Sequence, residues 1–163
     1  MSTLSTSEVH PASGLLGIPG HGLVDAYRVT DFVVKTEVEI ALRVDGSVPH
    51  LEDWLATQKR ESAVVISAWN PFSKSLPSEE NIRRNKELLT TIQVTGLLSA
   101  PAVGRPRNGK WDPEESFCVF DAPPEVIDAW MQRFEQYAVV LAKKDGTCWL
   151  LWHAAFRIAM AEL

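Results

Sequence analysis

The stretch Ala63-Val-Val-Ile-Ser-Ala-Trp-Asn-Pro-Phe-Ser73 decides the expected fold. Its first four residues form a continuous apolar run, which is the pattern of a central strand covered on both faces. The chain breaks at Asn70-Pro71, because the ring of Pro71 removes a backbone donor and pushes Asn70 towards an extended conformation. A long helix is expected over residues 78–95, with Ser78 as its N-cap. The stretch therefore predicts a buried strand, an irregular loop and a long helix.

Patterns on both sides of this unit predict six further strands and two further helices. The strands alternate polar and apolar residues or run apolar, and the helices follow prolines. The expected order is ββαβαββαββ, and about three helices on a mixed β-sheet predict a single-domain layered sandwich of the α/β class, with α+β as the alternative. The strands are expected at residues 29–34, 36–44, 97–103, 116–120, 137–141 and 147–152, and the helices at 51–59 and 124–134.

The length of 163 residues suits one domain with one core. Residues 1–23 are rich in Ser, Gly and Pro and predict a flexible N-terminal arm. The single α/β domain is expected over residues 24–152. Residues 153–163 carry helix-forming Ala, Met and Glu, and they predict a C-terminal tail or helix.

Composition narrows the function classes. The net charge of −5 makes nucleic acid an unlikely partner, because binding phosphates requires a basic face. The two cysteines form no CxxC motif and the four histidines lack ligand spacing, so we expect no metal and no cofactor. The first eight residues lack the features of a signal peptide, and no stretch is apolar enough to span a bilayer. The expected location is the cytoplasm, with no membrane contact.

The loop after the apolar run has the position of a ligand site. Open α/β sheets hold ligands where a loop leaves the carboxyl end of a buried strand and enters a helix. Ser67, Asn70 and Ser73 supply hydrogen-bond donors and acceptors there. Lys74 is placed to reach an anion at the start of the helix.

Two amides in the following helix require partners. At about 100° per residue, Asn81 and Asn85 fall within an apolar stripe, formed by Ile82, Leu88, Leu89 and Ile92. Leaving one such amide unpaired would cost about 1–3 kcal/mol. Two interpretations stay open: the amides brace the 70–77 loop, or they line a pocket together with Asn70.

A second informative stretch is Gly104-Arg-Pro-Arg-Asn-Gly-Lys-Trp-Asp-Pro-Glu-Glu-Ser116. Arg105 and its neighbouring cations lie beside the ring of Trp111, a combination that can clamp a phosphate or stack on a base. The alternative is an exposed connector whose Trp111 covers an edge of the core. Glu114 is the candidate general base.

Four segments resemble a bacterial family of small domains of unknown function. The family pattern has a Tyr-x-x-Thr near the start, a Thr-Ala-Trp-Asn-Pro-x-Ser loop followed by a helical Asn, a Trp-x-Pro-Glu-x-Ser turn and a Phe-Gly-Gln-Asn-Ala motif before a strand. The matching segments here are Tyr27 with Thr30, Ser67 to Ser73 with Asn81, Trp111 to Ser116, and Phe134-Glu-Gln-Tyr-Ala138. The chain departs from the pattern in having Ser67 for Thr, Glu135 for Gly and Tyr137 for Asn. The resemblance supplies no activity, but it implies one recurring set of residues: Asn70, Ser73, Asn81, Trp111, Glu114 and Gln136.

These observations support two functional hypotheses. The first is a small-ligand pocket for a nucleotide, a phosphorylated metabolite or an amide-bearing metabolite. In it Asn70, Asn81 and Gln136 orient the ligand, Lys74 or Arg105 neutralises an anion, and Glu114 serves as general base; whether a reaction occurs is left open. In the second hypothesis, the polar set is structural and the chain is a protein-interaction or regulatory module. A partner protein or a second copy would then bind the apolar residues of the C-terminal tail, Phe156, Ile158, Met160 and Leu163.

Overall fold

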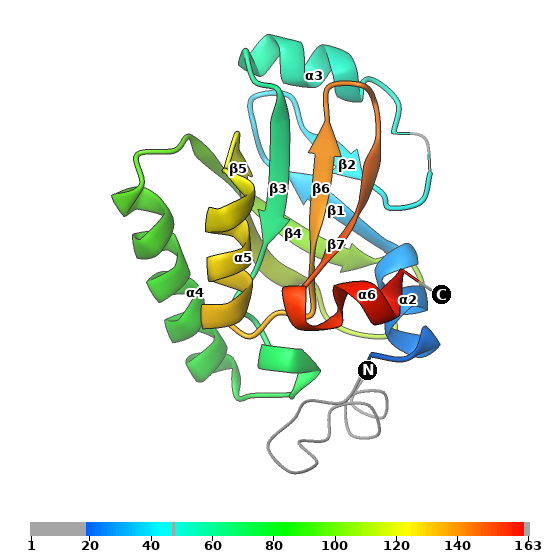
Figure 1. The fold of residues 1–163 in the computed structure, drawn as a ribbon, viewed down its shortest axis with the longest axis vertical. Coiled ribbons are helices and arrows are strands. Elements are labelled where there is room, and N and C mark those ends of the chain that lie inside the picture. The colour runs from blue at the N-terminus through cyan, green and yellow to red at the C-terminus, as the bar shows by residue number, and fades with distance from the viewer. Residues whose placement is uncertain (1–18, 47, 162–163) are drawn as a thin grey trace.

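The computed structural model of the protein describes residues 19–46 and 48–161. These residues form one seven-stranded sheet with the strand order β2-β1-β4-β5-β3-β6-β7, together with five α-helices and two 3-10 turns (Figure 1). The strands are β1 (Thr30–Val34), β2 (Ile40–Leu42), β3 (Ser62–Ile66), β4 (Ser99–Pro106), β5 (Glu114–Phe120), β6 (Ala138–Lys143) and β7 (Cys148–Trp152). The helical elements are α2 (His21–Arg28), α3 (Leu51–Gln58), η1 (Pro71–Ser73), α4 (Ser78–Val94), α5 (Pro124–Arg133), η2 (Ala154–Phe156) and α6 (Arg157–Met160).

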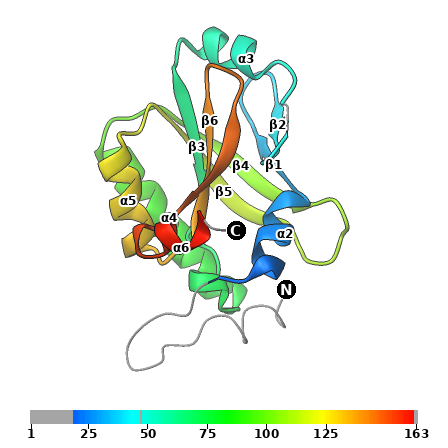
Figure 2. The same cartoon turned by 45° about the vertical axis from the view of Figure 1, so that its right-hand side comes forward.

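The sheet is strongly curled. One apolar cluster contains Ile40 and Leu42 from β2 together with Cys148 from β7, although these strands lie at opposite ends of the sheet order. Both edges reach this cluster only because the sheet wraps around it. The curl gives the sheet a concave face, which encloses the cluster, and a convex outer face (Figures 1 and 2).

Alternation along the strands assigns each side chain to one face. On β3, Ala63 and Val65 join the cluster on the concave face, whereas Val64 and Ile66 join a second cluster on the outer face. Helices α4 and α5 lie side by side over that outer face (Figure 2), and they contribute Leu88, Ile92, Ile127, Trp130 and Met131. Because both faces of β3 are covered, its whole run is apolar, as the sequence predicted.

Helix α3 covers one end of the concave face, which we call the closed end. Its residues Leu51, Trp54 and Leu55 are buried in the concave cluster. The indole Nε1–H of Trp54 donates a hydrogen bond of 2.9 Å to the hydroxyl of Thr36, so the polar atom of this large ring is satisfied. The opposite end, which we call the open end, lies near α2 and η1 (Figure 1).

A third cluster ties the C-terminal segment to the open end. Phe72 of η1 and Tyr137 pack against Phe156, with ring centroids 6.3 Å and 5.3 Å from that of Phe156. Leu23 of α2 and Met160 of α6 complete the buried set. The C-terminal segment is therefore part of the packed structure, because Phe156 of η2 and Met160 of α6 face inward.

The predicted mixed sheet is wrong, because every neighbouring pair of strands is antiparallel. A continuous apolar run shows only that both faces of a strand are covered, and a curled antiparallel sheet achieves this as well as a parallel one. The predicted order and the count of about three helices are also not matched, because α2 precedes β1 and α6 follows β7. Leu23, Ala26 and Tyr27 of α2 have helical spacing, but Gly20 and Gly22 obscured it.

Several predicted boundaries shift. The strand expected at 36–44 shortens to β2, β4 extends to Pro106, and β5 begins at Glu114. Pro77 occupies the N-cap position of α4, so the prediction of Ser78 as N-cap is wrong. Of the expected arm, residues 1–18 lie outside the described residues and residues 21–23 begin α2. None of the helices in residues 19–46 and 48–161 has the length and apolarity needed to cross a bilayer.

Replacing Phe156 tests the packing of the C-terminal segment. Phe156→Ala removes a ring that is 4% exposed, so we expect the free energy of unfolding to fall by about 3 kcal/mol. Ile158→Ala, at a side chain that is 84% exposed, is the matched control and should change little. Urea unfolding measures both, and equal effects of the two substitutions would contradict the packing described here.

Candidate functional site

The side chains on the concave face change from apolar to polar along its length. Towards the closed end its strands present apolar residues such as Val65, Cys118 and Phe120. Two residues further towards the open end, and therefore on the same face, β5 presents Ser116 and then Glu114. Ser67, two residues after Val65, likewise lines the open end. The curled sheet thus encloses an apolar core at one end and polar side chains at the other.

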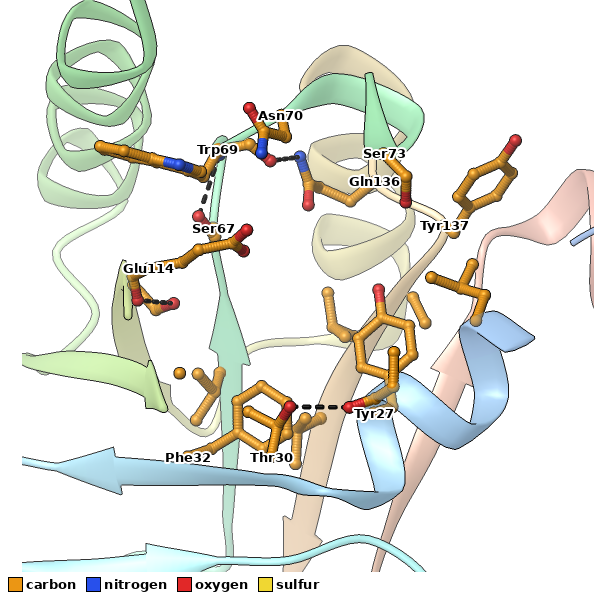
Figure 3. A pocket seen from close by; sticks show the side chains of 18 of the residues that line it. Tyr27, Thr30, Phe32, Ser67, Trp69, Asn70, Ser73, Glu114, Gln136 and Tyr137 are labelled. Carbon is orange, nitrogen blue, oxygen red and sulfur yellow. Dashed lines mark hydrogen bonds between the residues drawn. The ribbon is translucent and has the colours of Figure 1, made fainter. Parts of the chain in front are cut away.

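A cavity of about 90 Å³ occupies the open end. This is several times the space that one water molecule needs. Helix α2, strands β1 and β3 to β6, and the loops around residues 69–73 and 111 all contribute to its walls. The cavity is lined by Leu23, Ala26, Tyr27, Thr30, Phe32, Val65, Ser67, Trp69, Asn70, Ser73, Gly104, Trp111, Glu114, Ser116, Gln136, Tyr137, Ala138, Val139 and Val140 (Figure 3).

The loop over the cavity has an unusual backbone. Asn70, Phe72 and Ser73 adopt positive φ angles of 47°, 44° and 60°. A bulky residue such as Phe72 rarely adopts this conformation, which costs on the order of 1–3 kcal/mol per residue. The loop keeps its shape because Phe72 is buried in the third cluster and its backbone N–H donates to the carbonyl oxygen of Glu135.

Asn81 of α4 fixes the first half of this loop. Its Oδ1 accepts a hydrogen bond of 2.8 Å from the backbone N–H of Asn70. Its Nδ2 donates to Asn70 Oδ1 at 2.8 Å and to the carbonyl oxygen of Leu76 at 3.3 Å. Asn70 Oδ1 also accepts from the backbone N–H of Leu76 at 3.0 Å. The Asn81 amide is thus paired within the loop and does not line the cavity.

Asn85 and Arg84 fix the segment just before the loop. Asn85 Oδ1 accepts from the backbone N–H of Ala68 at 2.8 Å, and its Nδ2 donates to the carbonyl oxygen of Glu115 at 2.9 Å. Arg84 donates to the carbonyl oxygens of Ala68 and Phe134 at 2.9 Å and 2.7 Å. Helix α4 therefore joins the end of β3 to β5 and to the end of α5.

Two side-chain amides present free polar atoms to the cavity. Gln136 Nε2 donates to the carbonyl oxygens of Phe134 and Trp69, which fixes the amide orientation and leaves Oε1 as an acceptor with no partner among the described residues. Asn70 Oδ1 is occupied as described, so Asn70 Nδ2 is left as a donor. The hydroxyl of Ser73 also has no hydrogen bond in the described part of the chain. Figure 3 shows Gln136 and Ser73 pointing into the cavity below the loop.

Glu114 is the charged residue of the cavity lining. Its carboxyl points into the space that Tyr27 and Gln136 also face (Figure 3). Within residues 19–46 and 48–161 it has no hydrogen bond and no ion pair. Burial raises the pKa of this carboxyl to about 7, since few polar groups replace the water that it loses. Glu114 can therefore gain or lose a proton near neutral pH.

Tyr27 faces Glu114 from α2. Its ring stacks on Phe32, with centroids 6.4 Å apart, and meets Trp152 edge-on at 6.1 Å. Burial raises the pKa of the Tyr27 hydroxyl well above its usual value, and the charge of Glu114 and the presence of Tyr137 raise it further. The phenol therefore stays protonated and offers the cavity a neutral hydroxyl.

The structure brings together five of the nine residues that the sequence singled out, namely Asn70, Ser73, Trp111, Glu114 and Gln136. Asn81 and Asn85 lie behind the lining. Lys74 is exposed after η1. Arg105 is exposed because it follows Gly104 on β4 and so points away from the concave face. In the part of the chain that the structure describes, no three His, Cys, Asp or Glu side chains gather as metal ligands would.

Sequence reasoning assigned no individual site role to several lining residues. Leu23 and Ala26 reach the cavity on α2, whose helical spacing was present in the sequence. Phe32 alternates with its neighbours on β1 and could have been assigned to the concave face. Gly104 leaves space beside Phe32. Its position depends on the β1–β4 pairing, for which the sequence gave no indication.

Residues 66–139 match a family model described as a protein of unknown function (DUF3293). No curated protein and no solved structure matches the chain. The matched segment runs from the end of β3 to the start of β6, so it contains the loop, α4 and much of the cavity lining. The expected resemblance to a family of unknown function is confirmed over this segment, which is less than half of the chain.

Replacing Asn85 tests its bracing role. Asn85→Ala leaves the buried N–H of Ala68 and the carbonyl oxygen of Glu115 without their side-chain partner. We expect the free energy of unfolding to fall by about 2–3 kcal/mol. Lys86→Ala, at the next and exposed position of α4, is the control. Unfolding curves for Asn85→Ala that overlay those of wild type would sink the bracing role.

Replacing Glu114 tests its burial. The pKa is raised from 4.5 to about 7 on folding, so between these pH values the unfolded chain ionises Glu114 and the folded chain does not. Stability is therefore full below pH 4.5 and falls as pH rises through 7, by on the order of 3 kcal/mol. Glu114→Gln should remove this fall, whereas Glu115→Gln, at an exposed side chain, should retain it. Urea unfolding at pH 4.5 and pH 8 measures both, and identical pH profiles would contradict the burial of Glu114.

Proposed function

We propose that the protein binds a small polar molecule, or the polar end of a larger one, in the cavity at the open end of the sheet. The supporting observation is that residues distant in the sequence meet at this one cavity. Of the six residues that the family resemblance links, five line this one cavity from three segments of the chain, and the sixth, Asn81, holds Asn70 in place. Packing alone does not require polar side chains to gather around a cavity, nor to keep hydrogen-bond donors and acceptors without partners there.

The lining is arranged before any ligand arrives. The amides of Asn70 and Gln136 are each held by hydrogen bonds to the protein, so their free atoms, Nδ2 and Oε1, have fixed directions. A site that is already ordered loses little conformational entropy on binding. Apolar residues such as Val65 and Val140 complete the lining on the side of the closed end.

The charged side chains around the cavity indicate which class of ligand it can bind. Lys74 and Arg105, the residues expected to neutralise an anion, are not part of the lining, and neither is any other Lys, Arg or His of residues 19–46 and 48–161. A phosphate would have to enter beside Glu114 with no cation to balance it, which is unfavourable. Among the ligands considered from the sequence, the cavity thus favours an amide-bearing metabolite over a nucleotide phosphate or a phosphorylated sugar.

We propose binding rather than a reaction. Glu114 can transfer a proton near neutral pH, but the lining presents no cysteine, histidine or second carboxylate with which it could activate a nucleophile. The alternative of an interaction module loses its main support, since Phe156 and Met160 are buried. Among the described residues of the tail, only Ile158 is a large exposed apolar side chain.

Filling the cavity tests the proposal. A Cβ added at Gly104 would lie 3.5 Å from Phe32 and 3.6 Å from Thr30, both ordinary contacts. Gly104→Val therefore suits the strand, and its two methyl groups occupy the cavity. In a thermal-shift screen of amides, amines, nucleosides and phosphates, we expect at least one compound to stabilise wild type but not Gly104→Val. A ligand at about 100 times its dissociation constant adds roughly 2.7 kcal/mol.

The matched control is Gly46→Val, because a Cβ at Gly46 meets nothing within 4 Å and lies outside the cavity lining. It should respond to the same compounds as wild type does. A compound that stabilises wild type and Gly104→Val equally binds elsewhere. If every active compound behaves in that way, or if none acts, the proposed pocket is wrong.

A further inference from the structure

The cavity combines a single charge with many aromatic rings. Glu114 is its one charged side chain, and no basic residue of the described chain lines it. Five aromatic residues contribute to the lining, namely Tyr27, Phe32, Trp69, Trp111 and Tyr137, and the ring of Tyr137 also packs against Phe72 and Phe156. The carboxyl has neither a hydrogen bond nor an ion pair in the part of the chain that the structure describes. No group of the described residues therefore pairs with this carboxyl.

We infer that the ligand carries a cationic nitrogen, an alkylammonium group, held between the carboxylate of Glu114 and the aromatic rings of the cavity. This inference rests on the proposed function and names the class of ligand. Electron-rich ring faces attract cations, and more strongly where water is excluded. A carboxylate away from water likewise favours an opposite charge beside it.

The hydrogen-bonding groups fit an ammonium ion. An alkylammonium group has three N–H donors and no acceptor. The cavity offers it acceptors in the carboxylate of Glu114, in Gln136 Oε1 and in the hydroxyl of Ser73, which come from three different elements and face one space (Figure 3). The donor Asn70 Nδ2 lies at the loop, where it can meet an acceptor in the remainder of the ligand. A phosphate or carboxylate ligand would face these acceptors with like partial charge.

The neighbouring titratable groups allow a clear pH dependence. From α2, Tyr27 faces the cavity as a phenol. Tyr137, which precedes β6, also contributes to the lining, whereas the lining side chains of β1, β3 and β4 have no titratable group. Glu114 is thus the lining group that changes charge near neutrality, with a pKa of about 7. A bound cation favours the ionised carboxylate, so binding should release a proton and strengthen as pH rises.

Methylammonium is the probe, because it stays charged across the range, as a lysine side chain does. Titration into the full chain is followed by the indole N–H signals of the tryptophans, in sodium chloride solutions of constant ionic strength. We expect saturable shifts that are lost in Gly104→Val. With a Glu114 pKa of about 7, the affinity should be about tenfold higher at pH 8 than at pH 6.

Glu114→Gln should bind methylammonium at least tenfold more weakly at pH 8 and lose the pH dependence. Glu115→Gln, which removes the same charge from the opposite face of β5, should match wild type. Absence of saturable methylammonium binding to wild type, or equal binding by Glu114→Gln, overturns the cation inference. Acetamide and acetate are titrated in parallel. If either of them binds in a Gly104-dependent manner while methylammonium does not, the pocket stands and its ligand is not a cation.

Discussion

The hydrogen bonds from Asn81 and Asn85 to the loop backbone are the interactions on which the open end depends. After β3 the chain passes through left-handed residues, so its backbone amides have no strand partner. The two helix amides take their place by accepting from the N–H groups of Ala68 and Asn70. This pairing sets the position of Asn70, and it holds the carbonyl oxygen of Trp69 where Gln136 can donate to it. The cavity rim therefore depends on α4, although neither Asn81 nor Asn85 touches the cavity.

The curl of the sheet lets one surface act both as core and as site. Strand alternation sends every second residue to the concave face whatever its polarity. At the closed end those residues are apolar and α3 covers them, which provides the burial that stabilises the fold. At the open end the same rows continue as Ser67, Ser116 and Glu114, with no helix filling the space between them. The site is rigid because it is a continuation of the core.

The sequence predicted the parts of the site that depend on local pattern. Asn81 and Asn85 stood out because polar residues on an apolar stripe require partners, and the loop around Asn70 stood out because Pro71 ends the strand. Long-range pairing was not predictable in this way. Arg105 was expected beyond the end of the 97–103 strand, yet β4 extends through this position, pairs with β1 and turns Arg105 outward. The parallel or antiparallel sense of the sheet was equally hidden, since it depends on which strands become neighbours.

The distribution of unfavourable features argues that the open end is more than a brace. Strained backbone at Phe72 and a buried carboxyl at Glu114 each lower stability, and both lie in one region with Gln136 Oε1, which has no partner among the described residues. A bracing network would satisfy its own polar groups, as Asn81 and Asn85 do a few residues away. The open end thus combines paired amides on α4, behind the lining, with incompletely paired groups in front of it. That division places the structural role on α4 and leaves the groups facing the cavity available to a ligand.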